Sequence, residues 1–220
     1  MLTAVDRRQA FRYMGLHGAP SPQLLSLADV CEKALLSVIR PRYVHRIFPL
    51  VHREDGILCE GSTLLLTGED IRHHLEGCDR AVLFCATLSA AADAQIRMQQ
   101  QREITAGVMA DAMASALIEQ FCDQAEQEML AACPDAHATW RFSPGYGDLP
   151  LSVQPAFLTA IDAERRTGVC VSESGILIPR KSVTAIIGLS DHPVQRQKRG
   201  CAICNMAAHC PYRAKGEHCK

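Results

Sequence analysis

A long segment with helical spacing, residues 104–132, constrains the fold more than any other feature of this sequence. Its central part, VMADAMASALIEQF, is rich in alanine and methionine, and such small side chains let a neighbouring backbone approach closely. A second helical stretch, residues 89–101, precedes it, and a short apolar strand, residues 80–87, precedes both. We therefore expect a long, packed helix close to a buried strand.

The rest of the chain mixes helices and strands without regular alternation. We predict further helices at 6–15, with Asp6 as its cap, from Gln23 to just before Pro41, and at 68–77. We predict further strands at 42–52, 63–66, 140–143, 169–171, 175–178 and 182–189. Pro49 favours an edge or a bulge within the first of these. This order favours a single α+β domain with a bent, largely antiparallel sheet flanked by helices, rather than a doubly wound parallel sheet.

The sequence lacks the signals that are typical of several classes of protein. The longest weakly polar run, residues 81–92, is too short to cross a bilayer. Asp6, Arg7 and Arg8 stand where a signal peptide would need its apolar core, so we expect a cytoplasmic protein with reduced cysteines. The sequence contains no glycine-rich nucleotide loop, no H-E-x-x-H and no G-x-S-x-G, so these motifs assign no nucleotide-binding or hydrolase activity.

The end of the chain differs in charge and cysteine content from the rest. Residues 192–220 contain six Lys or Arg and one Glu, a net charge of +5, whereas the whole 220-residue chain carries -1. Four of the eleven cysteines also lie there. We therefore predict an α+β domain over 1–191 and a basic, cysteine-rich tail over 192–220. No series of aromatic residues accompanies the positive charge, so nucleic acid is not the expected partner.

The tail cysteines have spacings typical of a metal site. They follow the pattern C-x2-C-x5-C-x8-C and are Cys201, Cys204, Cys210 and Cys219. An iron–sulfur cluster, a zinc ion and free thiols are all compatible with this pattern, and His209 or His218 could replace Cys219 as a ligand. We predict that the other seven cysteines are small buried hydrophobic residues. Adjacent His73 and His74 point about 100° apart on a helix, so we expect them at the surface rather than on one metal.

Residues 141–147, RFSPGYG, combine groups that an amino-acid-bearing ligand needs. Arg141 supplies a planar cation for a carboxylate, the Pro-Gly turn exposes backbone N–H and C=O groups, and Tyr146 adds an aromatic face. The alternative is an ordinary turn that carries a surface arginine. Spacing alone leaves both interpretations open.

The segment 141–146 (RFSPGY) also carries a resemblance to a known family. Together with IDAERRTGV at 161–169, SES at 172–174, and Pro179, Ser182 and Val183, it resembles the activation domain of cobalamin-dependent methionine synthase over about residues 100–190. The N-terminal part is similar to standalone members of that family. The resemblance implies an α/β domain around a bent antiparallel sheet. It also implies binding of S-adenosylmethionine and reductive methylation of a cobalamin that has reached the inactive Co(II) state.

The resemblance assigns roles to particular residues. Arg141 corresponds to the arginine that holds the ligand carboxylate, and the ligand-binding turn corresponds to Ser143, Pro144, Gly145 and Tyr146. Tyr146 is also expected beside the cobalt, and Asp6 is a candidate for an acidic ligand contact. A second acidic position of the family corresponds to Ser115 here, so Asp111 or Glu119 on the same helix face could receive the ligand ammonium instead. Ile187 replaces a later aromatic residue.

The resemblance implies a standalone reactivation protein that acts on a cobalamin-binding methionine synthase or another corrinoid protein. The cobalamin would come from this partner, and the electron from an iron–sulfur centre in the tail or from a flavodoxin-type donor. The alternative is a non-catalytic, zinc-stabilised module that binds a corrinoid protein or the ligand. A methyltransferase acting on another nucleophile is less favoured, because no general base is evident near the turn.

Overall fold

The structure, a computed structural model, describes residues 2–16, 18–194, 208–209 and 213–215. Within these residues the larger sheet has six strands in the order β3-β2-β1-β4-β8-β5, and all neighbouring pairs are antiparallel. The strands are β1 (Arg42–His52), β2 (Ile57–Cys59), β3 (Leu65–Leu66), β4 (Arg80–Thr87), β5 (His137–Ala138) and β8 (Ser182–Ser190). A separate hairpin pairs β6 (Cys170–Val171) with β7 (Leu177–Ile178). The predicted α+β class with an antiparallel sheet is confirmed.

Strand β4 lies inside the sheet and is buried on both faces. It pairs with β1 on one side and with β8 on the other over its whole length. Successive side chains alternate between two cores, so that Phe84 belongs to one and Leu83 to the other. A strand covered on both faces has a continuous run of apolar residues. This is why the sequence of 80–87 predicted it.

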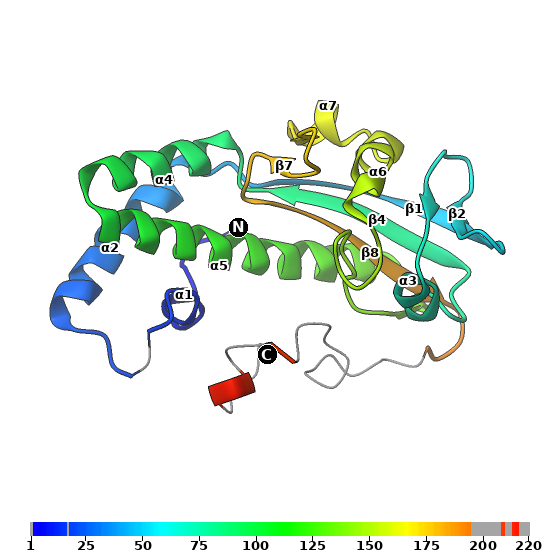
Figure 1. The fold of residues 1–220 in the computed structure, drawn as a ribbon, viewed down its shortest axis with the longest axis horizontal. Coiled ribbons are helices and arrows are strands. Elements are labelled where there is room, and N and C mark those ends of the chain that lie inside the picture. Colours follow the sequence, from blue (N-terminus) through cyan, green and yellow to red (C-terminus); the bar gives the residue numbers. More distant parts are fainter. Residues whose placement is uncertain (1, 17, 195–207, 210–212, 216–220) are drawn as a thin grey trace.

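One face of the sheet is covered by α1 (Arg7–Tyr13), α2 (Pro22–Val38), α4 (Ala90–Arg102) and α5 (Ile104–Ala131). Figure 1 shows α5 running along the sheet, and it contacts α1, α2 and α4. Helices α4 and α5 approach closely at Gly107, where a Cβ atom would lie 2.8 Å from the Cα atom of Gln100. The small residues of α5 therefore permit the close helix packing that the sequence predicted.

The opposite face is covered by α3 (Glu69–His74), α6 (Gln154–Ala160) and α7 (Ala163–Thr167), with a short 3-10 turn, η1 (Leu151–Val153), before α6. The sequence did not predict the helices between 151 and 167. They are short, Pro155 stands in the first turn of α6, and Asp162 between them has a left-handed backbone with φ of 56°. Buried residues such as Phe157 hold them on the sheet, and periodicity is weak over so few residues.

Two sequence predictions for the segments that α3 joins are wrong. Residues 140–143 do not form a regular strand, because only Phe142 pairs with β8, through a single bridge to Ile186. The regular strand β5 lies upstream of them. His74 is not at the surface but 6% exposed, and its Nε2 atom lies 2.9 Å from Thr139 Oγ1. Both outcomes depend on the packing of α3 against residues 139–142, a long-range contact that local sequence does not specify.

The predicted irregularity at Pro49 has a clear position in the sheet. Pro49 is the last residue of β1 to pair with β4, and the next residue, Leu50, pairs with β2. Proline lacks the N–H group that a continuous ladder would need. Pairing with β2 therefore begins just after the residue that has no N–H to donate, while on the β4 side Leu50 N still donates to Asp79 O at 2.8 Å.

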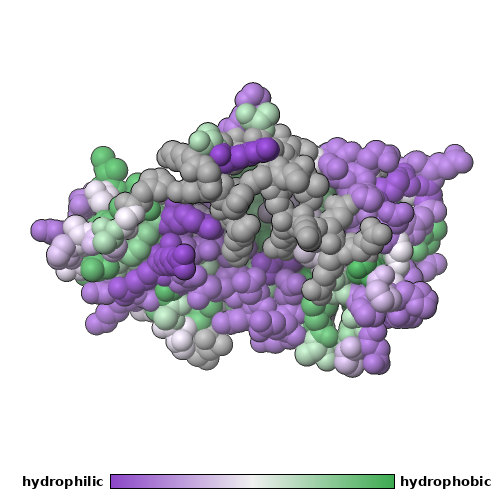
Figure 2. Space-filling view, turned by 90° about the horizontal axis from the view of Figure 1, so that it is seen from below, coloured by the Kyte–Doolittle hydropathy of each residue, from purple (hydrophilic) through white to green (hydrophobic). Residues whose placement is uncertain are grey.

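Within the described residues, no helix has the length and apolarity needed to cross a membrane. Figure 2 shows the molecule from below the view of Figure 1, and the coloured part of this face is mostly hydrophilic, with hydrophobic side chains in separate groups. The predicted tail, 192–220, is described only at 192–194, 208–209 and 213–215. Its four cysteines, Cys201, Cys204, Cys210 and Cys219, lie outside the described residues.

Candidate functional site

The segment that carries Arg141 lies between the two cores. It is held along β8 by hydrogen bonds from Thr139 N to Gly188 O and between the backbones of Phe142 and Ile186. Phe142 belongs to the core on the α3 side, whereas the Arg141 side chain extends to α5 on the other face. The alternation of an extended backbone thus directs the guanidinium toward the long helix.

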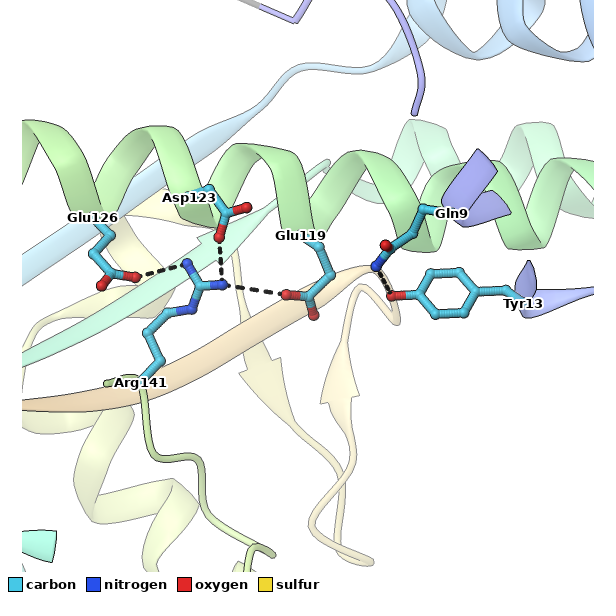
Figure 3. Close-up of polar contacts among 6 residues, drawn as sticks. All are labelled: Gln9, Tyr13, Glu119, Asp123, Glu126 and Arg141. Carbon is cyan, nitrogen blue, oxygen red and sulfur yellow. Dashed lines mark hydrogen bonds and ion pairs between the residues drawn. The ribbon is translucent and has the colours of Figure 1, made fainter. Parts of the chain in front are cut away.

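Three carboxylates of α5 surround the Arg141 guanidinium. Figure 3 shows Glu119, Asp123 and Glu126 on the helix face that the arginine approaches. The Nη2 atom lies 2.7 Å from Asp123 Oδ1 and 3.4 Å from Glu119 Oε2, and the Nη1 atom lies 2.9 Å from Glu126 Oε2. Positions 119, 123 and 126 share one side of a helix because they are four and three residues apart. One cation therefore organises three acidic side chains.

Arg141 is more buried than its three partners, of which Glu126 is 25% exposed. The Arg141 side chain is 10% exposed, whereas those of Glu119 and Asp123 are 40% and 53% exposed. Burial lowers the pKa of the guanidinium, but the hydrogen bond to Asp123 and the nearby negative charges outweigh burial and raise the pKa above its ordinary value. Arg141 thus stays charged, and the group has a surplus of two negative charges that face solvent.

Helix α1 borders this acidic group. Figure 3 shows Gln9 and Tyr13 beside Glu119, with Gln9 donating a 2.6 Å hydrogen bond to the Tyr13 hydroxyl. Burial raises the pKa of Tyr13, the hydrogen bond from Gln9 opposes this shift, and the charge of Glu119 adds to it. The Tyr13 hydroxyl therefore remains a neutral hydrogen-bonding group next to the carboxylates.

The structure places Asp6 at the start of α1 rather than against the turn. Its side chain accepts a 3.0 Å hydrogen bond from Gln9 N, which is the capping contact that the sequence predicted. Its own N–H donates to Gln120 Oε1 of α5 at 2.8 Å. Among the hydrogen bonds of the described residues, none joins Asp6 to residues 143–146. Asp6 contributes by fixing α1 on α5.

Ser115 and Asp111 belong to a different polar group on α5. Lys181, which precedes β8 and is buried, donates to Ser115 Oγ at 2.8 Å and lies 3.0 Å from Asp111 Oδ1. Of the two acidic alternatives on this helix face, Glu119 is thus the one beside Arg141. Ile187 is fully buried in the core on the α5 side.

The turn 143–149 is closed by its own backbone. Tyr146 N donates to Ser143 O, Leu149 N donates to Tyr146 O, and Gly145 N donates to Leu149 O. These amides are used inside the turn, so they are not the open donors that the sequence suggested. The Tyr146 side chain is 53% exposed, and its ring lies edge-on to that of Phe142, with centroids 6.0 Å apart. The turn therefore presents an aromatic ring to solvent.

Sequence reasoning missed four members of this surface: Gln9, Tyr13, Asp123 and Glu126. A usable signal was present, because acidic residues at 119, 123 and 126 form a stripe on a helix that is otherwise mostly buried. Within the described residues, no group of three His, Cys, Asp or Glu side chains is arranged to hold a metal ion.

Comparison with known proteins gives a relation at the level of the fold. No family model and no curated protein matches the chain. Among solved structures, the chain is similar to the MetH reactivation domain bound to AdoHcy, with a TM-score of 0.64 and 17% sequence identity. The match covers 88% of this chain and 76% of that chain. The two proteins share a fold. At this identity the likeness carries no residue roles, so the roles of individual residues rest on the geometry above.

Proposed function

We propose that this protein binds S-adenosylmethionine on the surface formed by α1, α5 and the 143–149 turn. We further propose that it supports reductive methylation of a Co(II) corrinoid that a partner protein carries, such as a cobalamin-binding methionine synthase. One observation carries the proposal: Arg141, the first residue of the segment 141–146 that bears the sequence resemblance, lies against the acidic face of α5 in a fold similar to the MetH reactivation domain.

The charges of this surface fit the proposed ligand. S-adenosylmethionine has two positive groups, the ammonium and the sulfonium, and one carboxylate. The exposed carboxylates of Glu119 and Asp123 suit the positive groups, and Arg141 suits the carboxylate. The contact between Arg141 and Glu119, at 3.4 Å, is the longest of the three ion pairs and is the one that a ligand carboxylate would replace most easily. Ser143, Pro144, Gly145 and Tyr146 would border the ligand on the turn side.

The proposed reaction needs a reductant and a methyl donor together. One electron reduces Co(II) to Co(I), and the cobalt electron pair then takes the methyl group as the S–CH3 bond breaks, which leaves S-adenosylhomocysteine. Reduction is unfavourable by itself, and a methyl donor held close to the cobalt draws it forward. The chain's own residues would bind and orient the donor, and the exposed ring of Tyr146 would lie beside the corrinoid. A flavodoxin-type protein or a cluster in the tail would supply the electron.

The proposal is tested by binding and then by reconstitution. We expect calorimetry to show binding of S-adenosylmethionine, and Asp123→Asn to weaken it about tenfold, because the variant loses a charge that faces the ligand cations. The matched control is Asp55→Asn, which removes the same charge from the exposed turn between β1 and β2. In the second step the full chain, S-adenosylmethionine, a low-potential reductant and a Co(II) corrinoid protein are mixed, and methylcobalamin is followed by its visible spectrum.

Each step has an outcome that contradicts the proposal. Absence of calorimetric binding would remove the ligand assignment. Equal affinities of Asp123→Asn and Asp55→Asn would place the ligand elsewhere on the molecule. A spectrum that stays that of Co(II), while a fused activation domain converts the same partner, would leave a ligand-binding protein without reactivation activity.

We also propose that the tail over 192–220 holds a metal centre through Cys201, Cys204, Cys210 and Cys219. Strand β8 ends at Ser190, and Asp191 pairs with Arg80 at 2.5 Å, so truncation after Asp191 keeps all strands of the described residues and this ion pair. We expect the truncated protein to stay folded, with bound iron or zinc lost, by circular dichroism and elemental analysis. A brown full-length chain that bleaches on reduction supports a cluster, and a colourless one with stoichiometric zinc supports a structural ion. Metal retained after truncation, or an unfolded product, would contradict the proposal.

A further inference from the structure

Helix α3 is attached to the segment that carries the candidate site. The carboxylate of Asp148, at the end of the turn, accepts hydrogen bonds from Glu69 N at 2.6 Å and Asp70 N at 3.0 Å. The carboxylate of Asp70 accepts one from Asp148 N at 3.1 Å. Each aspartate therefore binds backbone amides of the other's segment. The two residues form a reciprocal link between α3 and the turn.

The backbones at this link are too close for other side chains. A Cβ atom on Gly147 would lie 2.1 Å from Asp70 Oδ2, and one on Gly68 would lie 2.4 Å from Asp148 Oδ1. Both glycines have positive φ, 53° and 126°, which disfavours any other residue there. Glycine thus stands at both positions where a carboxylate approaches the backbone: Gly147 beside Asp70, and Gly68 beside Asp148.

A second contact joins the other end of α3 to the same segment. His74 Nε2 lies 2.9 Å from Thr139 Oγ1, and Thr139 Oγ1 accepts a 2.8 Å hydrogen bond from Gly188 N of β8. The His74 ring packs against Trp140 at 4.7 Å and Phe142 at 4.9 Å, and Phe142 contacts Tyr146. In the sequence, Arg141 stands between Trp140 and Phe142. Residues 139–148 are therefore held by α3 at both ends.

We propose that α3 is a positioning element for the ligand-binding surface, with Asp70 and Asp148 as positioning residues. This inference rests on the proposed function. Past Phe142 the hydrogen bonds of Ser143, Gly145, Tyr146 and Leu149 are internal to the turn, so they shape it without orienting it toward α5. The Asp70–Asp148 link supplies that orientation. Neither aspartate lies among the groups that would touch the ligand, and both act through the position of Tyr146 and Arg141.

The test uses the full chain with Asp70→Ala, Asp148→Ala and the double variant. The control is Glu69→Ala, which also removes an acidic residue from the first turn of α3, but whose side chain is 89% exposed and, among the described residues, pairs with Arg72 alone, at 3.8 Å. We expect either single variant to bind S-adenosylmethionine about five- to tenfold more weakly than the control. The double variant should lose little more, because one substitution already releases the turn.

The protein's single tryptophan provides a readout that does not depend on the ligand. Trp140 packs against both His74 and Phe142, so release of the turn should red-shift its emission while far-UV circular dichroism stays unchanged. Emission and affinity that both match the control would overturn the inference, as would additive losses in the double variant. A wild-type chain that binds no ligand would overturn the proposed function only, and the Trp140 emission would still decide the role of the link. If Asp148→Ala unfolds, Asp70→Ala and Thr139→Val make the same comparison from either end of α3.

Discussion

Replacement of Arg141 with alanine is expected to lower the free energy of unfolding by about 2 kcal/mol. The substitution leaves Glu119, Asp123 and Glu126 together on one helix face without their shared cation. Loss of one partner of a fully buried ion pair costs about 3–5 kcal/mol, and the loss is smaller here because two of the carboxylates are substantially exposed. Urea denaturation of both proteins, analysed with a common slope, measures the difference.

Two comparisons identify the cause of the Arg141→Ala loss. Arg141→Lys keeps the charge but not the planar fork, so it should retain a large part of the stability. High salt should reduce the difference between wild type and Arg141→Ala, because repulsion between half-exposed carboxylates is screened at about 1 M ionic strength. A loss that is insensitive to salt, and equal for lysine and alanine, would indicate lost side-chain packing rather than charge.

Replacement of Gly188 with alanine should lower the free energy of unfolding by about 2–3 kcal/mol through steric overlap. A Cβ atom there would lie 2.6 Å from Cys78 Sγ, 2.8 Å from Leu75 Cδ2 and 3.2 Å from Thr139 Cγ2. All three neighbours lie in connecting segments and are buried, Leu75 fully and Cys78 and Thr139 almost fully. Thermal and urea unfolding of the variant measure the loss. The substitution also displaces Thr139, so the emission of Trp140 should change with it.

The control for Gly188→Ala is Gly61→Ala, in the turn after β2. Gly61 has φ of 76° and no atom within 4 Å of an added Cβ, so only backbone strain of about 1 kcal/mol is expected. Cys78→Ala in the Gly188→Ala background should restore part of the stability, because it removes the nearest of the three atoms. Equal losses of stability at Gly188 and Gly61 would show that the space beside Gly188 is large enough to hold a Cβ atom.

Local sequence pattern predicted the elements whose signals lie within one segment. The apolar run of β4, the helical spacing of α2 and the capping contact of Asp6 all appear as expected. Helices α6 and α7 were missed because each is only a few residues long and is held by buried contacts with the sheet. The position of β5 and the burial of His74 depend on residues far apart in the chain.

The candidate site divides in the same way. Arg141 and Tyr146 stand in a recognisable motif, and the structure places them on one continuous segment. Their surroundings could not be inferred from that motif, because the carboxylates come from α5 and the border residues from α1. Glu119 was one of two acidic alternatives, and only the structure separates it from Asp111, which pairs with Lys181. Acidic residues spaced along one helix face can be recognised in the sequence. The cation that pairs with them cannot, because it comes from a distant segment.

The burial of β4 on both faces has a consequence for how the chain chooses its strand alignment during folding. A slip of one residue normally moves apolar side chains into water, and this cost selects the native register. In β4 both sets of side chains are apolar, so a slip would exchange one buried set for another with little change in polarity. The polar residues at its two ends must therefore distinguish the alignments: Arg80 pairs with Asp191, and the Thr87 hydroxyl accepts a hydrogen bond from Ser182. Substitutions at these end residues should thus affect the accuracy of strand pairing more than substitutions within the strand.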